Sequence, residues 1–361
     1  MDLYKKISIL GPSAQYDTCG PKDFGTTTDI PGVYHAKVGG SRVCRLFKVL
    51  QTNECVNSCN YCAFRRDRST TRAVATSDEM ATAFESAYSR RLVDGLFLSS
   101  GLDGSPDSTM TRMLDTAHIL RDKMSYRGYL HLKIMPRTSS SCISEAIRLA
   151  SRVSLNIEAP TEEDLTRLSP CKDLRSGFYH TMSLIKDEIR KQKRLGEKVP
   201  SITTQFVVGA GEERDRDIIN STSFLYKNFG LSRVFYSAFR PVHGTPLEDM
   251  PPASLTREHR LYQVDFLMRF YRFRPKDIPL GSDGNLFDDV DPKTIWAQNH
   301  PEFFPVNINT ASYWRLLRVP GMGPVTAKKV ISQRSSSCIR SIFELHNQRV
   351  QINKIEPYIC C

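Results

Sequence analysis

The sequence predicts an α/β protein, namely a partial (β/α)6 barrel followed by a small all-α domain at the C-terminus. Three observations support this class. Apolar strand-like segments alternate with helical patterns over residues 42–250, a stretch rich in Pro, Asp, Asn and Gly fills 275–305, and a basic helical pattern resumes near 306. Strands that alternate with helices imply right-handed crossovers and a parallel sheet.

The expected elements follow in chain order. Strands are expected over 43–50, 95–99, 129–135, 153–157, 202–208 and 234–239, and helices over 77–91, 108–124, 141–150, 177–195 and 213–228. In such a barrel the chemistry gathers at the C-terminal ends of the strands. The expected organisation is an N-terminal extension (1–41), the barrel (42–250), a helical and irregular connector (251–305) and the C-terminal domain (306–361).

Composition excludes several classes of protein. The 361 residues are 40% hydrophobic and 25% charged, which excludes disordered, collagen-like and coiled-coil chains. The longest apolar runs are far shorter than the roughly 18 residues that a membrane span needs. The apolar stretch after Lys5 and Lys6 breaks at Gly11-Pro12, too early for a signal peptide. We therefore expect a cytoplasmic protein with no membrane partner.

Charge and cysteine content add two expectations. The formal net charge is 50 − 39 = +11, which favours a polyanionic partner such as nucleic acid. Ten cysteines in a chain without a signal peptide indicate reduced thiols rather than disulfides. Where such thiols cluster, metal binding is the usual explanation.

Three cysteines lie together directly after the first strand. The sequence CVNSCNYC gives Cys55, Cys59 and Cys62 a C-x3-C-x2-C spacing. Three thiolates on one short loop can each bind one iron of a cubane cluster, and the fourth iron then stays open to a small molecule. A zinc loop, the alternative, needs a fourth Cys or His, and the next histidine is His118. Unrelated cysteines are the other alternative.

This loop, with Tyr61 before its third cysteine, resembles the signature of the radical S-adenosylmethionine (radical SAM) superfamily. The resemblance implies a radical SAM barrel that holds a [4Fe–4S] cluster and S-adenosyl-L-methionine (SAM). It also implies reductive cleavage of SAM to a 5′-deoxyadenosyl radical and an electron donor such as flavodoxin or ferredoxin. The cofactor then carries the difficult chemistry, and the protein positions the reactants.

The resemblance also implies SAM contacts after later strands. Ser99, Ser100 and Gly101 occupy the place of the superfamily's turn for the methionine amino group, although its glutamate is missing. Asn156 and Glu158 share one face of their strand by alternation. This polar pair suits the ribose hydroxyls or the surroundings of the SAM carboxylate, or else it faces solvent at an edge.

Two further segments match the superfamily pattern. The backbone at Val207 and Gly209 is expected to flank the adenine, with Glu212 completing an apolar-x-Gly-x-x-Glu pattern. The sequence RPVHGTP at 240–246 resembles a Pro-x-x-Gly-Thr-Pro turn found in several members. No catalytic side chain toward the substrate is assigned.

Other polar residues allow two interpretations each. His131 and Lys133 share a strand face, where they contact substrate or the SAM carboxylate or form an interior polar pair. Arg65, Arg66 and Arg68 either bind phosphate near the cluster or form a solvated basic loop.

The C-terminal segment 307–331 predicts two short helices joined by a tight turn. Thr310 is expected to cap the first helix and Pro324 to open the second. The apolar face is expected to comprise Leu316, Leu317, Val319, Val325, Val330 and Ile331. The segment resembles the helix-hairpin-helix motif of DNA-uptake proteins.

A turn of this kind is expected to bind DNA phosphate. The N–H groups of Gly321, Met322 and Gly323 precede a helix N-terminus, which favours an anion, and Lys328 and Lys329 add positive charge. Such contacts do not read bases, so binding is expected to be independent of sequence and sensitive to salt. The alternative is a helical hairpin that mediates protein packing.

The chain as a whole resembles a family of DNA modification or repair radical SAM proteins. Matching stretches include KVLQTNECVNSCNYC, HLKIMP, TTQFVVGAGEERDRDI and FYSAFRPVHGTP. The resemblance implies an enzyme that acts on DNA by lesion repair or by modification of a base or sugar. A radical SAM enzyme that modifies structured RNA and a non-catalytic DNA-binding iron–sulfur protein are the two alternatives.

Overall fold

The computed structural model describes residues 1–14, 31–37, 43–341, 343–344 and 352–361. The chain forms two compact units. The first comprises Met1–Glu213 and Phe224–Glu258, and the second comprises Arg214–Ser223 and His259–Cys361. No helix in these ranges is long and apolar enough to cross a membrane.

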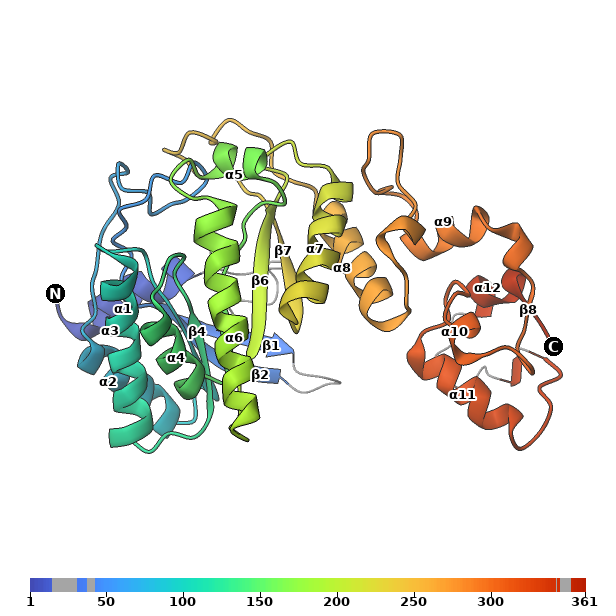
Figure 1. Ribbon diagram of the computed structural model, residues 1–361, viewed down its shortest axis with the longest axis horizontal. Helices are drawn as coiled ribbons and strands as arrows, with labels where there is room; N and C mark the ends of the chain where they lie inside the picture. The colour runs from blue at the N-terminus through green and yellow to red at the C-terminus, as the bar shows by residue number, and fades with distance from the viewer. Residues whose placement is uncertain (15–30, 38–42, 342, 345–351) are drawn as a thin grey trace. The chain divides into compact units, whose positions relative to one another are not determined.

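The first unit is built on one seven-stranded sheet in which the strands lie in chain order (Figure 1). The strands are β1 Val33–Lys37, β2 Val43–Leu50, β3 Gly95–Ser99, β4 Tyr129–Lys133, β5 Arg152–Ser154, β6 Ser201–Val208 and β7 Arg233–Ala238. Strands β2 to β7 are parallel, and β1 pairs antiparallel with β2. Since β1 and β7 remain as edges, the sheet is a curled half-barrel. The predicted partial (β/α)6 barrel is confirmed.

With the exception of the short helix at Glu162–Leu168, the helices of the barrel begin and end close to the predicted positions. They are α2 Ser77–Ser89, α3 Pro106–His118, α4 Ser140–Leu149, α5 Glu162–Leu168, α6 His180–Arg194 and α7 Asp215–Phe229, with π-helical turns at Ile119–Lys123 and Leu174–Tyr179. A capping box between Thr76 and Glu79 fixes the start of α2. In Figure 1, α2, α3, α4 and α6 lie side by side over the sheet.

Three elements of the first unit were not predicted. They are β1, helix α1 (Leu3–Ser13) and helix α5. Gly11 and Pro12 lie inside the last turn of α1, so the helix does not end before them. A Cβ on Gly11 would lie 2.7 Å from the backbone nitrogen of Gly32, so glycine allows this helix end to approach the turn before β1.

Strand β5 ends earlier than predicted, for a local reason. The N–H of Ile157 donates to the hydroxyl of Thr204 at 3.0 Å instead of to a strand carbonyl. Glu158 then adopts φ = 68° and forms an isolated bridge with Phe206. The alternation of a regular strand therefore does not extend from Asn156 to Glu158.

The two faces of the sheet differ in burial. Alternate residues of β3 and β4, such as Leu96, Leu98, Leu130 and Leu132, are fully buried on the helix-covered face. Burying one such side chain contributes roughly 1.5–3 kcal/mol. The opposite face carries half-buried residues, including Phe97 and the polar side chains of β4. The helices thus stabilise one face and leave the other for function.

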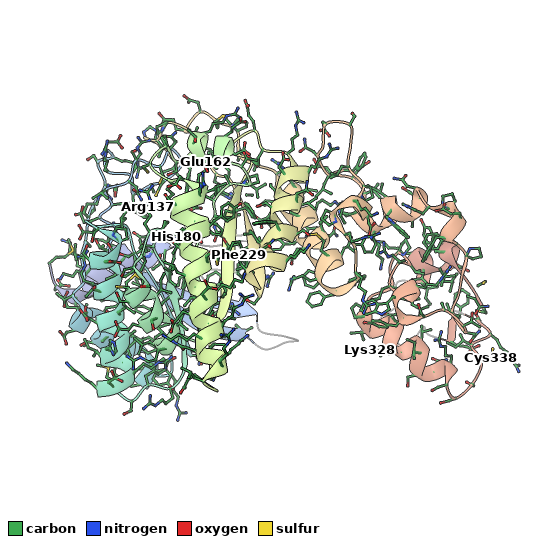
Figure 2. The ribbon with its side chains drawn as sticks, in the orientation of Figure 1. Arg137, Glu162, His180, Phe229, Lys328 and Cys338 are labelled. Atoms are coloured by element: carbon green, nitrogen blue, oxygen red, sulfur yellow. The ribbon has the colours of Figure 1, made fainter. Side chains whose placement is uncertain are left out.

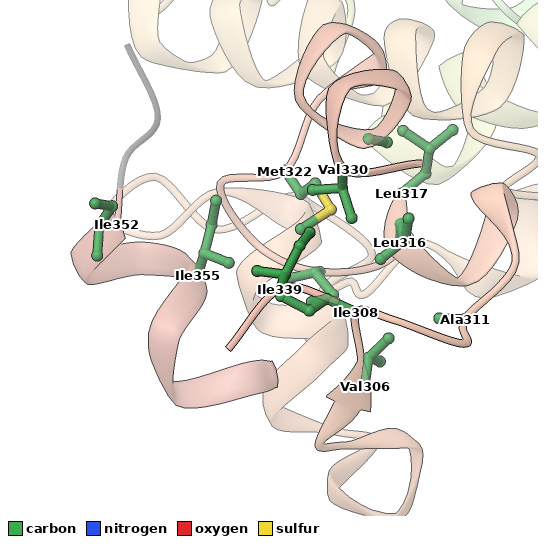
Figure 3. Packing of buried hydrophobic residues seen from close by; sticks show 12 residues of the cluster. Val306, Ile308, Ala311, Leu316, Leu317, Met322, Val330, Ile339, Ile352 and Ile355 are labelled. Carbon is green, nitrogen blue, oxygen red and sulfur yellow. The ribbon is translucent and has the colours of Figure 1, made fainter. Parts of the chain in front are cut away.

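The second unit contains short helices around its own core. Its elements include α8 Leu255–Phe270, which crosses from the first unit, α9 Pro292–Gln298, α10 Tyr313–Leu316, α11 Pro324–Arg334 and α12 Ile352–Ile355. A short parallel pair, β8 Val306–Asn307 with β9 Ile359–Cys360, adds a sheet that the all-α prediction lacked. Figure 3 shows the buried cluster, in which Met322 packs with Val330 and Ile339.

Candidate functional site

The three cysteines lie in the loop that follows β2, at the C-terminal end of the first parallel strand. Cys59 is buried, whereas Cys55 and Cys62 are half-buried. None of the three forms a disulfide bond with another described cysteine. The loop is therefore at the edge of the sheet where the sequence placed it, and its thiols are available as ligands.

Arg72 closes this loop. Its guanidinium donates to the carbonyl oxygens of Asn53, Phe64, Arg65 and Arg68, with 2.8 Å between Nη2 and the Arg65 oxygen. Charge-assisted hydrogen bonds to several carbonyls fix a loop backbone more firmly than neutral ones. Sequence reasoning missed Arg72, because no motif marks an arginine that acts on main-chain oxygens.

Gly101 packs the end of β3 against the start of the cysteine loop. Its N–H donates to the Thr52 carbonyl at 2.8 Å, and a Cβ on Gly101 would lie 2.1 Å from the Glu54 carbonyl oxygen. Ser99 is buried, and its carbonyl accepts from the N–H of Gln51 at 2.7 Å. The expected SAM-binding turn is thus in direct contact with the cysteine loop, and Gly101 is required there by close backbone approach.

Two buried polar atoms near the loop have no hydrogen-bond partner among the described residues. They are the Ser100 hydroxyl oxygen and Nη1 of Arg65. The rest of the Arg65 guanidinium pairs with Asp67, and the thiols of Cys59 and Cys62 lie within its electrostatic range. A buried polar group without a partner costs free energy, so both atoms fit a bound polar ligand.

Cys59 lies in a small cluster of side chains from two segments. Its Sγ is 3.0 Å from the Ser169 hydroxyl, which is 3.3 Å from Sγ of Cys171. The hydrogen bond with Cys171 and burial together raise the pKa of the Cys59 thiol. Cys171 lies more than a hundred residues from Cys59 in the sequence, and only the folded chain brings it beside the loop.

Glu158 does not point freely toward a ligand. Its Oε1 is 2.9 Å from Nζ of Lys172, and its backbone bonds on both sides to β6 residues. Burial and then the Glu158 carboxylate raise the pKa of the Tyr61 hydroxyl. Asn156, by contrast, is half-buried, and its side chain has no hydrogen bond within the described part of the chain.

The loop after β6 is held by Glu213 rather than by Glu212. Buried Glu213 accepts from the N–H groups of Gly209 and Gly211. Glu212, which fits the superfamily pattern, is exposed and pairs with Arg167. The N–H of Val207 donates to the Glu158 carbonyl at 2.8 Å. Neither Val207 nor Gly209 therefore has a free amide to offer, and adenine contacts there would use other backbone atoms.

Gly209 itself needs to be glycine. Its φ is 89°, and a Cβ would lie 2.5 Å from Cβ of Ala253.

The remaining polar candidates are mostly engaged. His131 Nε2 is 2.9 Å from the Ser154 hydroxyl, and its ring stacks on Phe97 at 4.2 Å, as an interior polar residue would. Arg68 donates to the carbonyls of Ala63 and His243. Of the three loop arginines, Arg65 is buried, Arg68 is half-buried and Arg66 is exposed, so the solvated-loop interpretation is wrong for Arg65.

The second helix of the hairpin begins where it was predicted, but the residue that caps the first helix is not the predicted one. Ser312, not Thr310, caps α10 by accepting from the N–H of Arg315. Pro324 occupies the first position of α11, as predicted. Val325 is exposed rather than part of the core, whereas Leu316, Leu317 and the cluster around them are buried.

The turn of the hairpin offers two backbone amides. The N–H of Met322 donates to the Val319 carbonyl, and its side chain is buried, so Met322 is not the predicted phosphate contact. The N–H groups of Gly321 and Gly323 have no acceptor among the described residues. Gly321 has φ = 77°, which glycine adopts without strain.

Two lysines follow this turn in the sequence, and a third contacts it from another segment. Lys328, shown on α11 in Figure 2, and Lys329 are exposed. Buried Lys293 was not predicted, and its Nζ donates to the Met322 carbonyl at 2.6 Å.

Comparisons with known proteins agree with both parts of the chain. A family model described as a helix-hairpin-helix motif matches residues 303–350. The 7,8-didemethyl-8-hydroxy-5-deazariboflavin synthase of Methanosarcina mazei is 23% identical over 329 residues, which cover 83% of this chain and 93% of that protein. The motif match covers the hairpin described above.

Among solved structures, methylornithine synthase (PylB) has a TM-score of 0.49 at 15% identity, covering 77% of this chain and 67% of its own. A [FeFe]-hydrogenase maturase, HydG, has a TM-score of 0.48 at 16% identity and covers 60% of this chain. This chain spans 48% of that HydG chain.

The decisive observation is the position of the C-x3-C-x2-C loop, directly after the first parallel strand of an open (β/α) half-barrel. This is the position that the resemblance to the radical SAM superfamily predicts for the loop. Radical SAM proteins use a [4Fe–4S] cluster and S-adenosylmethionine.

The residues present fit these cofactors. The loop supplies three thiols, and the two unpartnered atoms, Ser100 Oγ and Arg65 Nη1, suit the polar groups of an amino acid. Within the described ranges, no three His, Cys, Asp or Glu side chains are arranged to hold a single metal ion. The thiolates of a cubane bind separate irons and need not converge on one point.

Proposed function

We propose that this chain is a radical SAM enzyme whose substrate is DNA, which it repairs or modifies at a base or sugar. The observation that carries the proposal is the hairpin turn, where two amides that have no acceptor in the described part of the chain precede a basic helix, in the same chain as the cysteine loop. The helix-hairpin-helix match over 303–350 supports it.

At the barrel, each residue is assigned a role by its position. The thiolates of Cys55, Cys59 and Cys62 would hold the cluster, with Tyr61 in the same loop. Cluster and SAM together supply reductive radical chemistry when bound, with electrons from a donor such as flavodoxin or ferredoxin.

The residues assigned to SAM are those that the superfamily resemblance implies. Ser100 and Asn156 offer side-chain polar groups that have no partner among the described residues, and Ser99, Gly101, Val207 and Gly209 would contribute backbone. In this arrangement Glu158 acts through its ion pair with Lys172 and orders the neighbouring strand ends.

At the hairpin, the N–H groups of Gly321 and Gly323 would donate to a phosphate oxygen. The N-terminus of α11 adds the favourable dipole for an anion, and Lys328 and Lys329 add charge. None of these groups reads a base edge, so the affinity should fall steeply with salt and depend little on sequence.

The enzymatic part is tested with Cys59→Ala and, as a matched control, the exposed Cys338→Ala. After anaerobic reconstitution and reduction, wild type and Cys338→Ala should bind iron and release 5′-deoxyadenosine from SAM, whereas Cys59→Ala should do neither. Equal product from Cys59→Ala would refute the enzyme assignment.

The nucleic-acid part is tested with Gly321→Glu together with Gly323→Glu. We expect the affinity for duplex DNA to fall at least tenfold while the iron spectrum is unchanged. The control, Ser336→Glu with Ser337→Glu, adds the same charge at the other end of α11, where both side chains are exposed. Equal losses in both variants would refute the turn as the contact, and tighter binding to duplex RNA than to DNA would reassign the substrate.

A further inference from the structure

Three of the exposed aromatic side chains of the second unit share a feature. Phe266, Phe270 and Trp314 are 47%, 45% and 37% exposed, respectively. Single exposed apolar residues are common on protein surfaces. These three differ because each ring lies against an arginine.

The contacts between rings and guanidinium groups are close. Arg269 lies 4.7 Å from the ring centre of Phe270 and 5.4 Å from that of Phe266, and the two rings are 5.4 Å apart. Arg272 lies 3.6 Å from the ring centre of Trp314. Each distance is within the range of a cation–π interaction.

The core of the unit does not explain these aromatic residues. Leu261, Val264 and Leu267 form the buried face of α8 at helical spacing. Phe266 and Phe270 are one turn apart, outside that set, and remain exposed. Phe266 and Phe270 therefore lie on a second face of α8, which is exposed and is separate from the buried face.

The same segment is positively charged. Residues 266–274 contain Arg269, Arg272 and Arg274 and no acidic residue. Buried Asp265 bonds to the Arg269 guanidinium, and Asp277 lies within 3.6 Å of the Arg274 guanidinium. Arg272 forms no ion pair with an acidic residue of the described chain, and its guanidinium packs on Trp314.

We propose that these five residues, Phe266, Arg269, Phe270, Arg272 and Trp314, form a binding surface for unpaired bases of single-stranded DNA. The inference rests on the proposed DNA substrate. Aromatic rings stack on any base, and a basic side chain beside them attracts the strand's phosphates, which is how proteins bind single strands without reading sequence. Arg272 supplies that charge here, since Arg269 is paired with Asp265. A protein partner would not need an arginine on each of these three rings.

The surface has a use in the proposed reaction. An enzyme that acts on a base must take that base out of the duplex stack, which costs unstacking free energy. A unit that binds duplex phosphates through its hairpin and unpaired bases through its aromatic residues would favour locally opened DNA over intact duplex.

Trp314 provides a direct readout. The chain has two tryptophans, and the other one, Trp296, is only 6% exposed. Titration of the full chain with an oligo(dT) strand should quench tryptophan fluorescence, and Trp314→Phe should abolish the quenching. Quenching that is undiminished in Trp314→Phe would overturn the proposed surface.

Affinity is tested with Phe266→Ser plus Phe270→Ser, which changes exposed side chains and should leave the melting temperature nearly unchanged. We expect at least a tenfold loss of affinity for oligo(dT), and duplex affinity within twofold of wild type. Phe287→Ser is the control, because Phe287 is 41% exposed in the same unit and makes no cation–π contact with an arginine in the described structure. It should bind both ligands normally.

The outcomes separate the two proposals. If the hairpin variant loses duplex binding while the phenylalanine variant keeps full affinity for oligo(dT), this inference is overturned and the DNA substrate stands. If wild type binds neither duplex nor single strand, the DNA substrate fails and this inference fails with it.

Discussion

Lys172 Nζ lies 2.9 Å from Glu158 Oε1 in an ion pair whose side chains are only 18% and 6% exposed. Burial alone would lower the pKa of Lys172, but the Glu158 carboxylate raises it. The positive charge also acts on Cys59, where it lowers the pKa that other contacts raise. The pair thus connects the end of β5 to the surroundings of the cysteine loop.

Removing one member of this pair should be costly. Lys172→Met leaves the Glu158 carboxylate buried without its partner, and we expect the free energy of unfolding to fall by about 3 kcal/mol. The double variant Lys172→Met with Glu158→Gln should recover most of that loss, because no uncompensated charge remains. Urea unfolding of the three proteins measures this, and equal losses in single and double variants would contradict it.

Gly101→Ala should displace the start of the cysteine loop. The added Cβ meets the Glu54 carbonyl oxygen, which belongs to backbone and cannot rotate away, so we expect a loss of roughly 1–3 kcal/mol. Iron bound per chain after reconstitution should fall in parallel. Gly177→Ala is the control, since its Cβ would have no neighbour nearer than 3.4 Å. The idea is wrong if both alanine variants load iron like wild type.

Arg72→Lys should weaken cluster incorporation while keeping the charge. A lysine ammonium cannot span the four carbonyls that the guanidinium joins. We expect less than half of the wild-type iron content and faster proteolysis between residues 53 and 72. Arg66→Lys, at an exposed neighbouring position, should load normally. Full iron content in Arg72→Lys would show that the loop does not need this arginine.

The free energy of unfolding should depend on pH because Lys293 is buried. Burial lowers its pKa to about 7 from an ordinary value of 10.5, opposed by Asp291 and reinforced by Arg318. Between these two pH values the unfolded chain binds a proton that the folded chain does not, so stability rises with pH. The slope is at most about 1.4 kcal/mol per pH unit.

Lys293→Met removes this contribution. Urea unfolding at pH 6.5, 8 and 9.5 should show wild type gaining stability with pH relative to the variant. Parallel pH profiles for the two proteins would contradict the assignment. Binding of duplex DNA by Lys293→Met then reports whether its hydrogen bond to the Met322 carbonyl orders the turn.

The sequence determined the features that depend on neighbouring residues. Alternating apolar segments gave the order of β2 to β7 and the helices between them, because each element's period is local. The C-x3-C-x2-C spacing located the cysteine loop, and the Gly-x-Gly-Pro sequence located the hairpin turn and the start of α11. The cap of α10 was predicted wrongly, because Ser312 rather than Thr310 accepts from the N–H of Arg315.

The tertiary structure alone decided which distant residues meet. Arg72 reaches back to Asn53, Lys172 pairs with Glu158, and Ser169 lies between Cys59 and Cys171. Glu212 has φ = 56°, and the backbone there places the two neighbouring carboxylates in different environments. Glu213 therefore holds the loop after β6, whereas Glu212 pairs with Arg167. Such contacts depend on loop paths and strand register, which no local spacing encodes, and they set the burial and charge on which the site's chemistry depends.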